Sequence, residues 1–396
     1  MMKALRYILV GFFTWLIWLL VSQYLLCARY QFDDPVPFEG TGIYNPYDSL
    51  SPDRWMKCNF HAHSRAWEGI TNGHGTAEQV HKAYKKLRYD FHCVSNYHYI
   101  DTTYSFEPGY IPAYEHGYNI SKTHQLILGA TDVKWLDYLF PQSIHNKQHV
   151  LDDLKGPSQI VILNHPALRN GYTPQDLAQL SGYDCMEVLS PSVISTNQWD
   201  AALSSGKKAF LVGDDDIHDV LKKERLGQMC TFVNVPGNAS SHVLSALKTG
   251  RSYGVVIGNG QVLNSLPGLD FVRVKGDSVI IKMSRPACEA KLYGQHGRVL
   301  TSRSNSDLLT YKLSPKDHYA RATFEYSNGT SIYLNPVFYT SPSAWRNTPG
   351  SYVNTRETAF FRTLGIIVLF SWLLMVWTFL TGRNIQRHQK KTLSFK

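Results

Sequence analysis

The sequence predicts an α/β fold in which a β/α barrel is followed by a small antiparallel β-sandwich, with an apolar membrane-spanning helix at each end of the chain. Three observations lead to this prediction. Short apolar runs alternate with helical patterns from Trp55 onward, and after Gly260 they give way to closely spaced strands of alternating character. The segments 7–28 and 363–382 carry no charge, and each is near the ~20 residues that span a bilayer as a helix.

The two apolar segments are interpreted as membrane anchors. Segment 7–28 is too long for the core of a signal peptide and lacks a small-x-small cleavage site, so it is expected to remain uncleaved. Segment 363–382 has a buried core helix as its alternative. Its dense tryptophan and phenylalanine content and the abrupt basic flank favour a membrane span.

The net charge of +9 comes mostly from the two tails outside these segments. Their basic residues, with no acid among them, are Lys3, Arg6, Arg383, Arg387, Lys390, Lys391 and Lys396. Short basic tails stay in the cytoplasm, so both termini are expected there and the large central region outside the cell membrane. The charge therefore indicates membrane topology, with lipid contacts along two spans. No nucleic-acid partner is expected.

The predicted organisation has seven parts. In chain order they are a transmembrane helix (7–28), a proline-rich linker (29–53), a metal-binding barrel (54–260), a β-sandwich (261–341), a second linker (342–362), a second transmembrane helix (363–382) and a basic cytoplasmic tail (383–396).

Within the barrel region, helix signals separate the apolar runs. Thr76 with Gln79 forms a capping-box pattern that opens a helix ending at Leu87. Thr173 precedes a proline at the first helical position. Further helices are predicted over 197–204 and between Ser240 and Gly250. The strand candidates are WMKCNF, YDFHCVS, HQLILG, QIVILN, DCMEVLS and KKAFLVG. This alternation favours a mostly parallel sheet, either open or closed.

Histidines and acids stand where the apolar runs stop. The candidate metal ligands are His61, His63, His98, Glu115, His124, His165, Asp216 and His218. An open sheet collects ligands at one crevice from two or three strands, whereas here six strand ends carry candidates, which favours closure into a barrel. Imidazole and carboxylate gathered at strand ends are what a multi-metal hydrolytic site requires.

Beyond residue 260 the pattern is that of antiparallel strands. Gly276-Asp277 is a turn between alternating runs, and Asn328-Gly329 is a strong two-residue hairpin signal. Five or more such strands predict the small sandwich.

The order of these motifs resembles the PHP superfamily, the polymerase and histidinol phosphatase domain, over about residues 55–254. The H-x-H motif matches His61-Ala62-His63, and the bridging glutamate matches Glu115. The later matches are His124 before its LG pair, His165-Pro166, and the D-x-H motif Asp216-Ile217-His218. The resemblance implies a distorted (β/α)7 TIM-like barrel that holds two or three divalent ions, Zn, Mn or Fe, for phosphoester hydrolysis.

The sequence departs from that family at two places. Asn96-Tyr97 stands where the family has Asp-His, and Asn72 stands where an acid usually follows H-x-H. These positions normally help to hold the second or third ion. His98 is the candidate replacement for the missing histidine, one residue late.

The predicted function is that of a membrane-anchored, metal-dependent phosphoesterase acting on a small-molecule phosphoester. Glu115 and Asp216 are expected to carry catalysis, with Glu115 bridging two ions, one on each oxygen. Arg65 and Arg169 are candidates for binding the substrate phosphate, although exposure to solvent explains each equally well. Two alternatives stay open: a catalytically weakened binding or scaffolding module, and hydrolysis of a non-phosphate bond at a similar cluster.

Overall fold

The computed structural model describes residues 2–259, 266–341 and 350–381, and the chain divides into two compact units. One comprises residues 1–30 and 353–396, and the other residues 31–352. The predicted basic tail and residues 342–349 of the second predicted linker lie outside the described residues.

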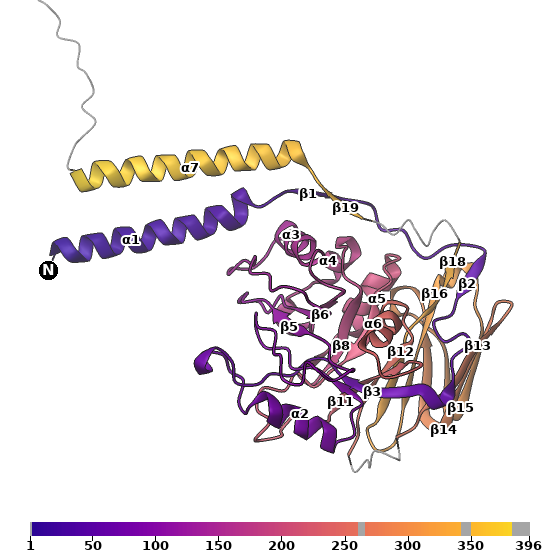
Figure 1. The fold of residues 1–396 in the computed structure, drawn as a ribbon. Coiled ribbons are helices and arrows are strands. Elements are labelled where there is room, and N and C mark those ends of the chain that lie inside the picture. The colour runs from indigo at the N-terminus through magenta and orange to yellow at the C-terminus, as the bar shows by residue number, and fades with distance from the viewer. Residues whose placement is uncertain (1, 260–265, 342–349, 382–396) are drawn as a thin grey trace, which may run out of the picture. The chain divides into compact units, whose positions relative to one another are not determined.

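The first unit is a pair of long helices, α1 (Met2–Val21) and α7 (Thr355–Thr381), which run side by side (Figure 1). A π-helical turn, Ser22–Leu26, extends the first. Spans Ala4–Leu26 and Thr355–Thr381 are long and apolar enough to cross a membrane. Only 6% of each apolar window is buried, which is unlike a core helix. Inside the unit, the Trp372 indole N–H donates to the Thr14 hydroxyl at 3.0 Å.

The second unit contains a six-stranded sheet in which every strand except the two-residue β9 is buried. Its hydrogen-bonded order is β10-β8-β7-β6-β5, with β9 on β8. The strands are β5 (Ala113–His116), β6 (Gln125–Leu128), β7 (Ile160–Leu163), β8 (Cys185–Ser190), β9 (Val193–Ile194) and β10 (Phe210–Gly213). β7, β8 and β10 are parallel, whereas β6 is antiparallel to both β5 and β7.

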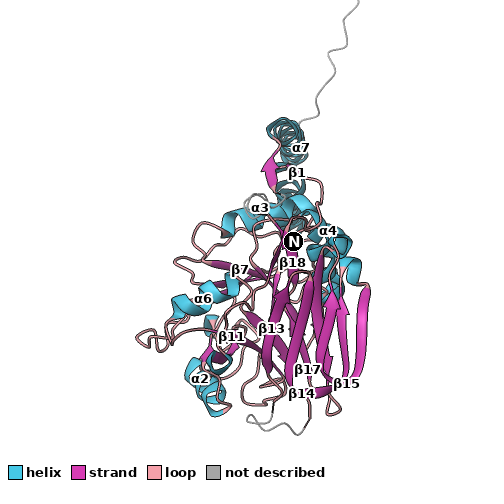
Figure 2. Ribbon diagram, turned by 90° about the vertical axis from the view of Figure 1, so that its right-hand side faces the viewer, coloured by secondary structure: helices cyan, strands magenta, loops and turns pink. Residues whose placement is uncertain are grey.

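An eleven-stranded sheet makes up most of the rest. Eight of its strands follow one another in the hydrogen-bonded order β13-β14-β16-β17-β12-β11-β3-β4, and the other three pair at its sides. Its long C-terminal strands lie side by side in Figure 2. The strands are β2 (Gly42–Tyr44), β3 (Trp55–Asn59), β4 (Phe91–His92), β11 (Met229–Asn234), β12 (Ser252–Val256), β13 (Leu269–Lys275), β14 (Ser278–Tyr293), β15 (Val299–Lys312), β16 (Tyr319–Glu325), β17 (Ser331–Leu334) and β18 (Val337–Thr340). Two short strands, β1 (Tyr30–Phe32) and β19 (Ser351–Val353), pair with each other.

The mixed α/β class is as predicted, but one closed barrel and a separate sandwich are not confirmed. Among the described residues the barrel region contributes to two sheets of mixed direction, because β6, β11 and β12 run antiparallel to their neighbours. β17 pairs with β12, so hydrogen bonding continues across the predicted boundary at residue 260. Their shared core includes Val255 and Ile332, both fully buried.

The helices of this unit begin largely where the capping signals place them. Thr76 and Thr173 each form a capping box. The last helix begins at Ser240, one residue after its N-cap, and Gly250 follows it at φ +69°. The helices are α2 (Ala77–Lys86), α3 (Ile144–Leu154), α4 (Pro174–Gln179), α5 (Thr196–Ser204) and α6 (Ser240–Lys248). The sequence did not predict α3, which occupies a stretch interpreted only as polar.

Both predicted hairpins form, but only the first has a two-residue turn, because residues 326–330 separate β16 from β17. Gly276 has φ +57° between antiparallel β13 and β14, and Gly329 has φ +85° between antiparallel β16 and β17. Short 3-10 turns lie at Pro52–Arg54, Trp67–Gly69, Leu168–Asn170, Gln295–Gly297 and Pro315–Asp317.

Candidate metal centre

Strand ends of the second unit bring six predicted ligands to one place. His61 and His63 follow β3, and Glu115 lies within β5. His124 immediately precedes β6, and because β6 is antiparallel to β5 and β7 its start meets the end of β7, where His165 stands. Asp216 follows β10. Because β6 runs in the opposite direction, its start places His124 at the same edge of the sheet that the end of a parallel strand would reach.

The six side chains form two groups of three, His61, His63 and Asp216, and Glu115, His124 and His165. Within each group one ligand atom per residue lies within 4.8 Å of the others, and all six residues are buried. These are the nitrogen and oxygen donors that transition-metal ions and zinc bind in proteins. Each group is thus chemically suited to one divalent ion.

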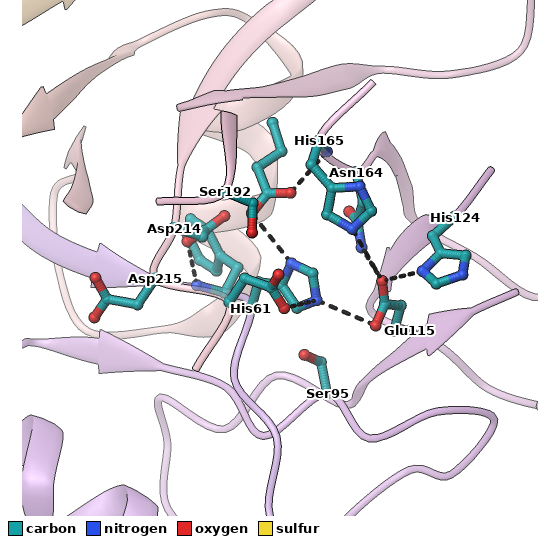
Figure 3. Close-up of polar contacts among 12 residues, drawn as sticks. His61, Ser95, Glu115, His124, Asn164, His165, Ser192, Asp214 and Asp215 are labelled. Carbon is teal, nitrogen blue, oxygen red and sulfur yellow. Dashed lines mark hydrogen bonds and ion pairs between the residues drawn. The ribbon is translucent and has the colours of Figure 1, made fainter. Parts of the chain in front are cut away.

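Glu115 belongs to the second group and also faces the first, and Figure 3 shows it between His61 and His124. Its Oε2 is 3.3 Å from His61 Nε2 and 3.0 Å from His63 Nε2. Its Oε1 is 2.8 Å from His124 Nδ1 and 3.6 Å from His165 Nε2. Asp216 Oδ1 completes the first group at 3.3 Å from His61 Nε2. One carboxylate thus faces histidines of both groups.

Two carboxylate oxygens in this cluster are buried without a hydrogen-bond donor. They are Glu115 Oε2 and Asp216 Oδ1, and both face the His61 and His63 imidazoles. A buried anionic oxygen without a donor or cation is costly. The donor set therefore fits a metal ion, which would satisfy both oxygens at once.

The electrostatics of the cluster favour a cation at His61. Burial lowers the pKa of its imidazole, but the carboxylates of Asp216, Glu115 and Glu187 together raise that pKa well above its usual value. Burial likewise raises the pKa of Glu115, yet His61 and His124 hold it well below the normal range. The carboxylates thus stabilise positive charge here, whether a proton or a metal ion supplies it.

Glu187, in the middle of β8, orients the ligands from behind. Its Oε1 is 3.1 Å from His61 Nδ1, and its Oε2 accepts the backbone N–H of His165 at 2.8 Å. A carboxylate that holds the other nitrogen of a metal-binding imidazole fixes its tautomer and direction. The sequence signal was available: Glu187 is the one charged residue inside the apolar run CMEVLS.

Two residues at this site have a positive φ, a backbone conformation that residues other than glycine rarely adopt. His165 and Asp216 have φ +29° and +46°. Such strain costs about 1–3 kcal/mol per residue and persists only where surrounding contacts enforce it. Part of that enforcement comes from Asp216 N, which donates to the His61 carbonyl at 3.1 Å.

Asp214 and Asp215, which precede Asp216, are buried and accept hydrogen bonds from backbone N–H groups. Asp214 accepts from the Phe60 N–H at 2.6 Å. Asp215 accepts from three consecutive N–H groups, those of residues 227–229, and from the Tyr84 hydroxyl. They fix the loop that carries Asp216 beside the end of β3.

A cavity of about 330 Å³ opens onto the cluster, and its walls carry two basic residues that the sequence did not single out. These are Lys122 and Arg225. The Arg225 guanidinium lies 2.8 Å from the Ser192 hydroxyl and 3.6 Å from Asp216 Oδ2. The predicted phosphate-binding residues, Arg65 and Arg169, are exposed and do not line this cavity; Arg169 donates instead to the Ile120 carbonyl.

The two remaining predicted ligands, His218 and His98, belong to neither group of three. His218 packs against His63 with ring centroids 4.3 Å apart and lines the cavity, with Nδ1 3.5 Å from Asp216 Oδ1. His98 is not brought into the cluster. Its Nδ1 hydrogen-bonds to the Lys134 carbonyl and its Nε2 accepts from the Gly117 N–H, so the backbone occupies both nitrogens.

The departures from the family pattern have structural roles. Asn96 holds Ser64 through two hydrogen bonds, Ser64 N to Asn96 Oδ1 and Asn96 Nδ2 to Ser64 Oγ. Tyr97 stacks on His63 at 4.6 Å and forms part of the cavity wall, as does Asn72. An aromatic ring and amides thus occupy the positions where the family has further ligands.

Comparison with known proteins adds one structure. No family model matches the chain, and neither does any curated protein. The crystal structure of a two-domain protein containing a predicted PHP-like metal-dependent phosphoesterase, from Bacteroides vulgatus ATCC 8482, is similar at 16% identity. The match covers 80% of this chain and 98% of that one with a TM-score of 0.40, too low to support any argument.

Proposed function

We propose that this protein is a membrane-anchored phosphoesterase that uses two divalent ions, one at each group of three ligands. The observation that carries the proposal is the pair of buried, donorless carboxylate oxygens facing the His61 and His63 imidazoles. A pair of ions there supplies an activated water and neutralises charge on a phosphoryl group.

The chain's own residues account for the rest of the reaction. Glu115 spans the two groups and is the proposed bridging ligand, with Asp216 closing the first group. Lys122 and Arg225 line the cavity and are the proposed phosphate-binding residues in place of Arg65 and Arg169. The cavity volume of about 330 Å³ suits a small phosphoester rather than a folded partner.

The two apolar helices support anchoring in the cell membrane. The proposed topology keeps both termini in the cytoplasm and the second unit outside, following the positive-inside rule. The distorted (β/α)7 barrel and the separate sandwich, with the domain limits given above, remain predictions.

A binding module without catalysis is the second candidate, and Asn96 and Tyr97 favour it. Both stand where the family places ligands, and both are committed to other contacts. On that account the cavity would bind a ligand without turning it over. Hydrolysis of a non-phosphate bond is a further alternative, which a substrate panel separates.

The direct test is metal content per chain and hydrolysis of p-nitrophenyl phosphate by the purified full-length protein. We expect metal together with turnover, and expect His61→Ala and Asp216→Ala to abolish turnover in folded protein. His242→Ala, at an exposed histidine of α6, is the matched control and should keep full activity. Bound metal without turnover of any phosphoester would select the binding module. Unchanged rates in both cluster variants would refute the site.

A further inference from the structure

A second polar cavity, of about 420 Å³, lies in the same unit but shares no lining residue with the metal cluster. One wall is the face of the sheet formed by β14, β16 and β17. The register pairs Tyr293 with Arg321 and Tyr333 with Thr323, so these side chains share one face. The alternate residues of β16, Ala322 and Phe324, point to the hydrophobic core.

The opposite wall is α5, which supplies Asn197 and Asp200, together with the turn at Gly297. Gly297 has φ +69°, and a Cβ at this position would lie 2.7 Å from Asp200 Oδ2. Only glycine therefore lets this turn approach the carboxylate so closely. The cavity thus lies between the strands β14, β16 and β17 on one side and α5 with the Gly297 turn on the other.

The charges inside this cavity are balanced. Arg321, only 3% exposed, makes two hydrogen bonds to Asp200, at 2.7 and 2.5 Å, and lies over the Tyr293 ring at 4.3 Å. Glu325 is exposed at the edge. With the guanidinium neutralised and a further acid nearby, the cavity does not favour phosphate or another anion.

Thr323 lines this cavity, and its hydroxyl lacks a hydrogen-bond partner among the described residues. Thr323 is 4% exposed, and its Oγ1 is buried without a hydrogen bond. Such groups are rare in folded proteins, and each calls for a ligand or water to satisfy it. Thr323 is thus an unused donor and acceptor set between a tyrosine ring and a neutralised ion pair.

We propose that this cavity binds a neutral saccharide. Sugars present hydroxyl groups to Thr323, Asn197 and the Asp200–Arg321 pair, and apolar C–H faces to the Tyr333 ring. A set of hydrogen-bond donors and acceptors beside an aromatic side chain matches this chemistry, whereas an anion would meet the negative charge that Glu325 adds to the neutralised pair. The proposal is independent of the phosphoesterase proposal.

The test is saturation-transfer NMR of the full-length protein with four probes, maltose, cellobiose, lactose and N,N′-diacetylchitobiose, followed by calorimetric titration of any that respond. We expect at least one to bind, and expect Thr323→Val, which keeps the side-chain shape, to weaken binding about tenfold. Tyr333→Ala should weaken it to a similar degree. Thr310→Val, at an exposed threonine on β15, is the matched control and should bind as the unaltered chain does.

Two outcomes would overturn the proposal. One is the absence of signal transfer from all four disaccharides. The other is binding that Thr323→Val and Tyr333→Ala leave unchanged, which would place the saccharide elsewhere on the protein. Turnover of p-nitrophenyl phosphate, measured on the same preparations, should be the same in all three variants.

Discussion

The metal-cluster cavity and the cavity beside α5 differ in how their buried charges are paired. Around His61 the carboxylates of Glu115, Glu187 and Asp216 converge, and two of their oxygens lack any donor. In the other cavity, Asp200 is matched by Arg321 through two hydrogen bonds. Positive charge at the first cavity, from a proton or a metal ion, would offset this excess of carboxylates, whereas the neutralised pair needs none. This difference is the basis for proposing metal ions at the first cavity and a neutral ligand at the second.

The largest expected effect comes from replacing the carboxylate between the two ligand groups. Glu115→Gln keeps the shape but removes the charge, so we expect loss of bound metal and a fall in kcat of about 10³-fold or more. Glu325→Gln, in the saccharide cavity, is the matched control. Metal analysis and phosphatase assays on both variants check the comparison, and equal activities would remove the distinction between the two cavities.

The next effect concerns stability rather than chemistry. Arg321→Met leaves Asp200 buried without its cation, which costs about 3–5 kcal/mol of unfolding free energy. Thermal unfolding of the detergent-solubilised chain measures the loss. The double variant Asp200→Leu with Arg321→Met should recover most of it, and metal content should not change. A single variant as stable as the unaltered chain would show that the pair is not effectively buried.

A smaller effect on metal affinity is expected from replacing Glu187, which lies behind the proposed metal ligands. Glu187→Gln can no longer accept hydrogen bonds from both His61 and the His165 backbone. Metal affinity should fall about 10–100-fold, as for other residues that orient ligating histidines. Competition with a chelator of known affinity measures this. Glu187 would lose its proposed orienting role if the affinity stayed within a factor of two.

The smallest effect tests which basic residues meet the phosphate. Arg225→Gln and Lys122→Gln should each raise KM for p-nitrophenyl phosphate about tenfold, since each removes a charge-assisted hydrogen bond. Arg65→Gln and Arg169→Gln should leave KM within twofold, because neither side chain lines the cavity. A raised KM in the Arg65 and Arg169 variants, with KM unchanged in the other two, would instead assign phosphate binding to the two arginines that the sequence suggested.

The sequence predicted which side chains converge better than it predicted the sheet that carries them. Five of the converging residues were recognisable because each lies in or beside an apolar run, where a buried polar group without a partner is costly. They are His61, His63, Glu115, His165 and Asp216. Periodicity identified the strands but not their directions or partners. Strand direction depends on contacts between residues far apart in the chain, so the reversal at β6 and the pairing of β17 with β12 left no local signal.

Residues that act from loops were the hardest to predict. Arg225 and Lys122 follow no strand, and their position in the cavity depends on how the loops fold back. His98 shows the opposite error. It follows a strand as the six converging residues do, but its ring is turned toward the backbone at Lys134 and Gly117.

The central claim is that six converging side chains form a centre for two divalent ions, and anomalous scattering from crystals of the metal-loaded protein tests it most directly. The account predicts two anomalous peaks, one among His61, His63 and Asp216 and the other among Glu115, His124 and His165. Metal-loaded crystals with no peak at either group would contradict it.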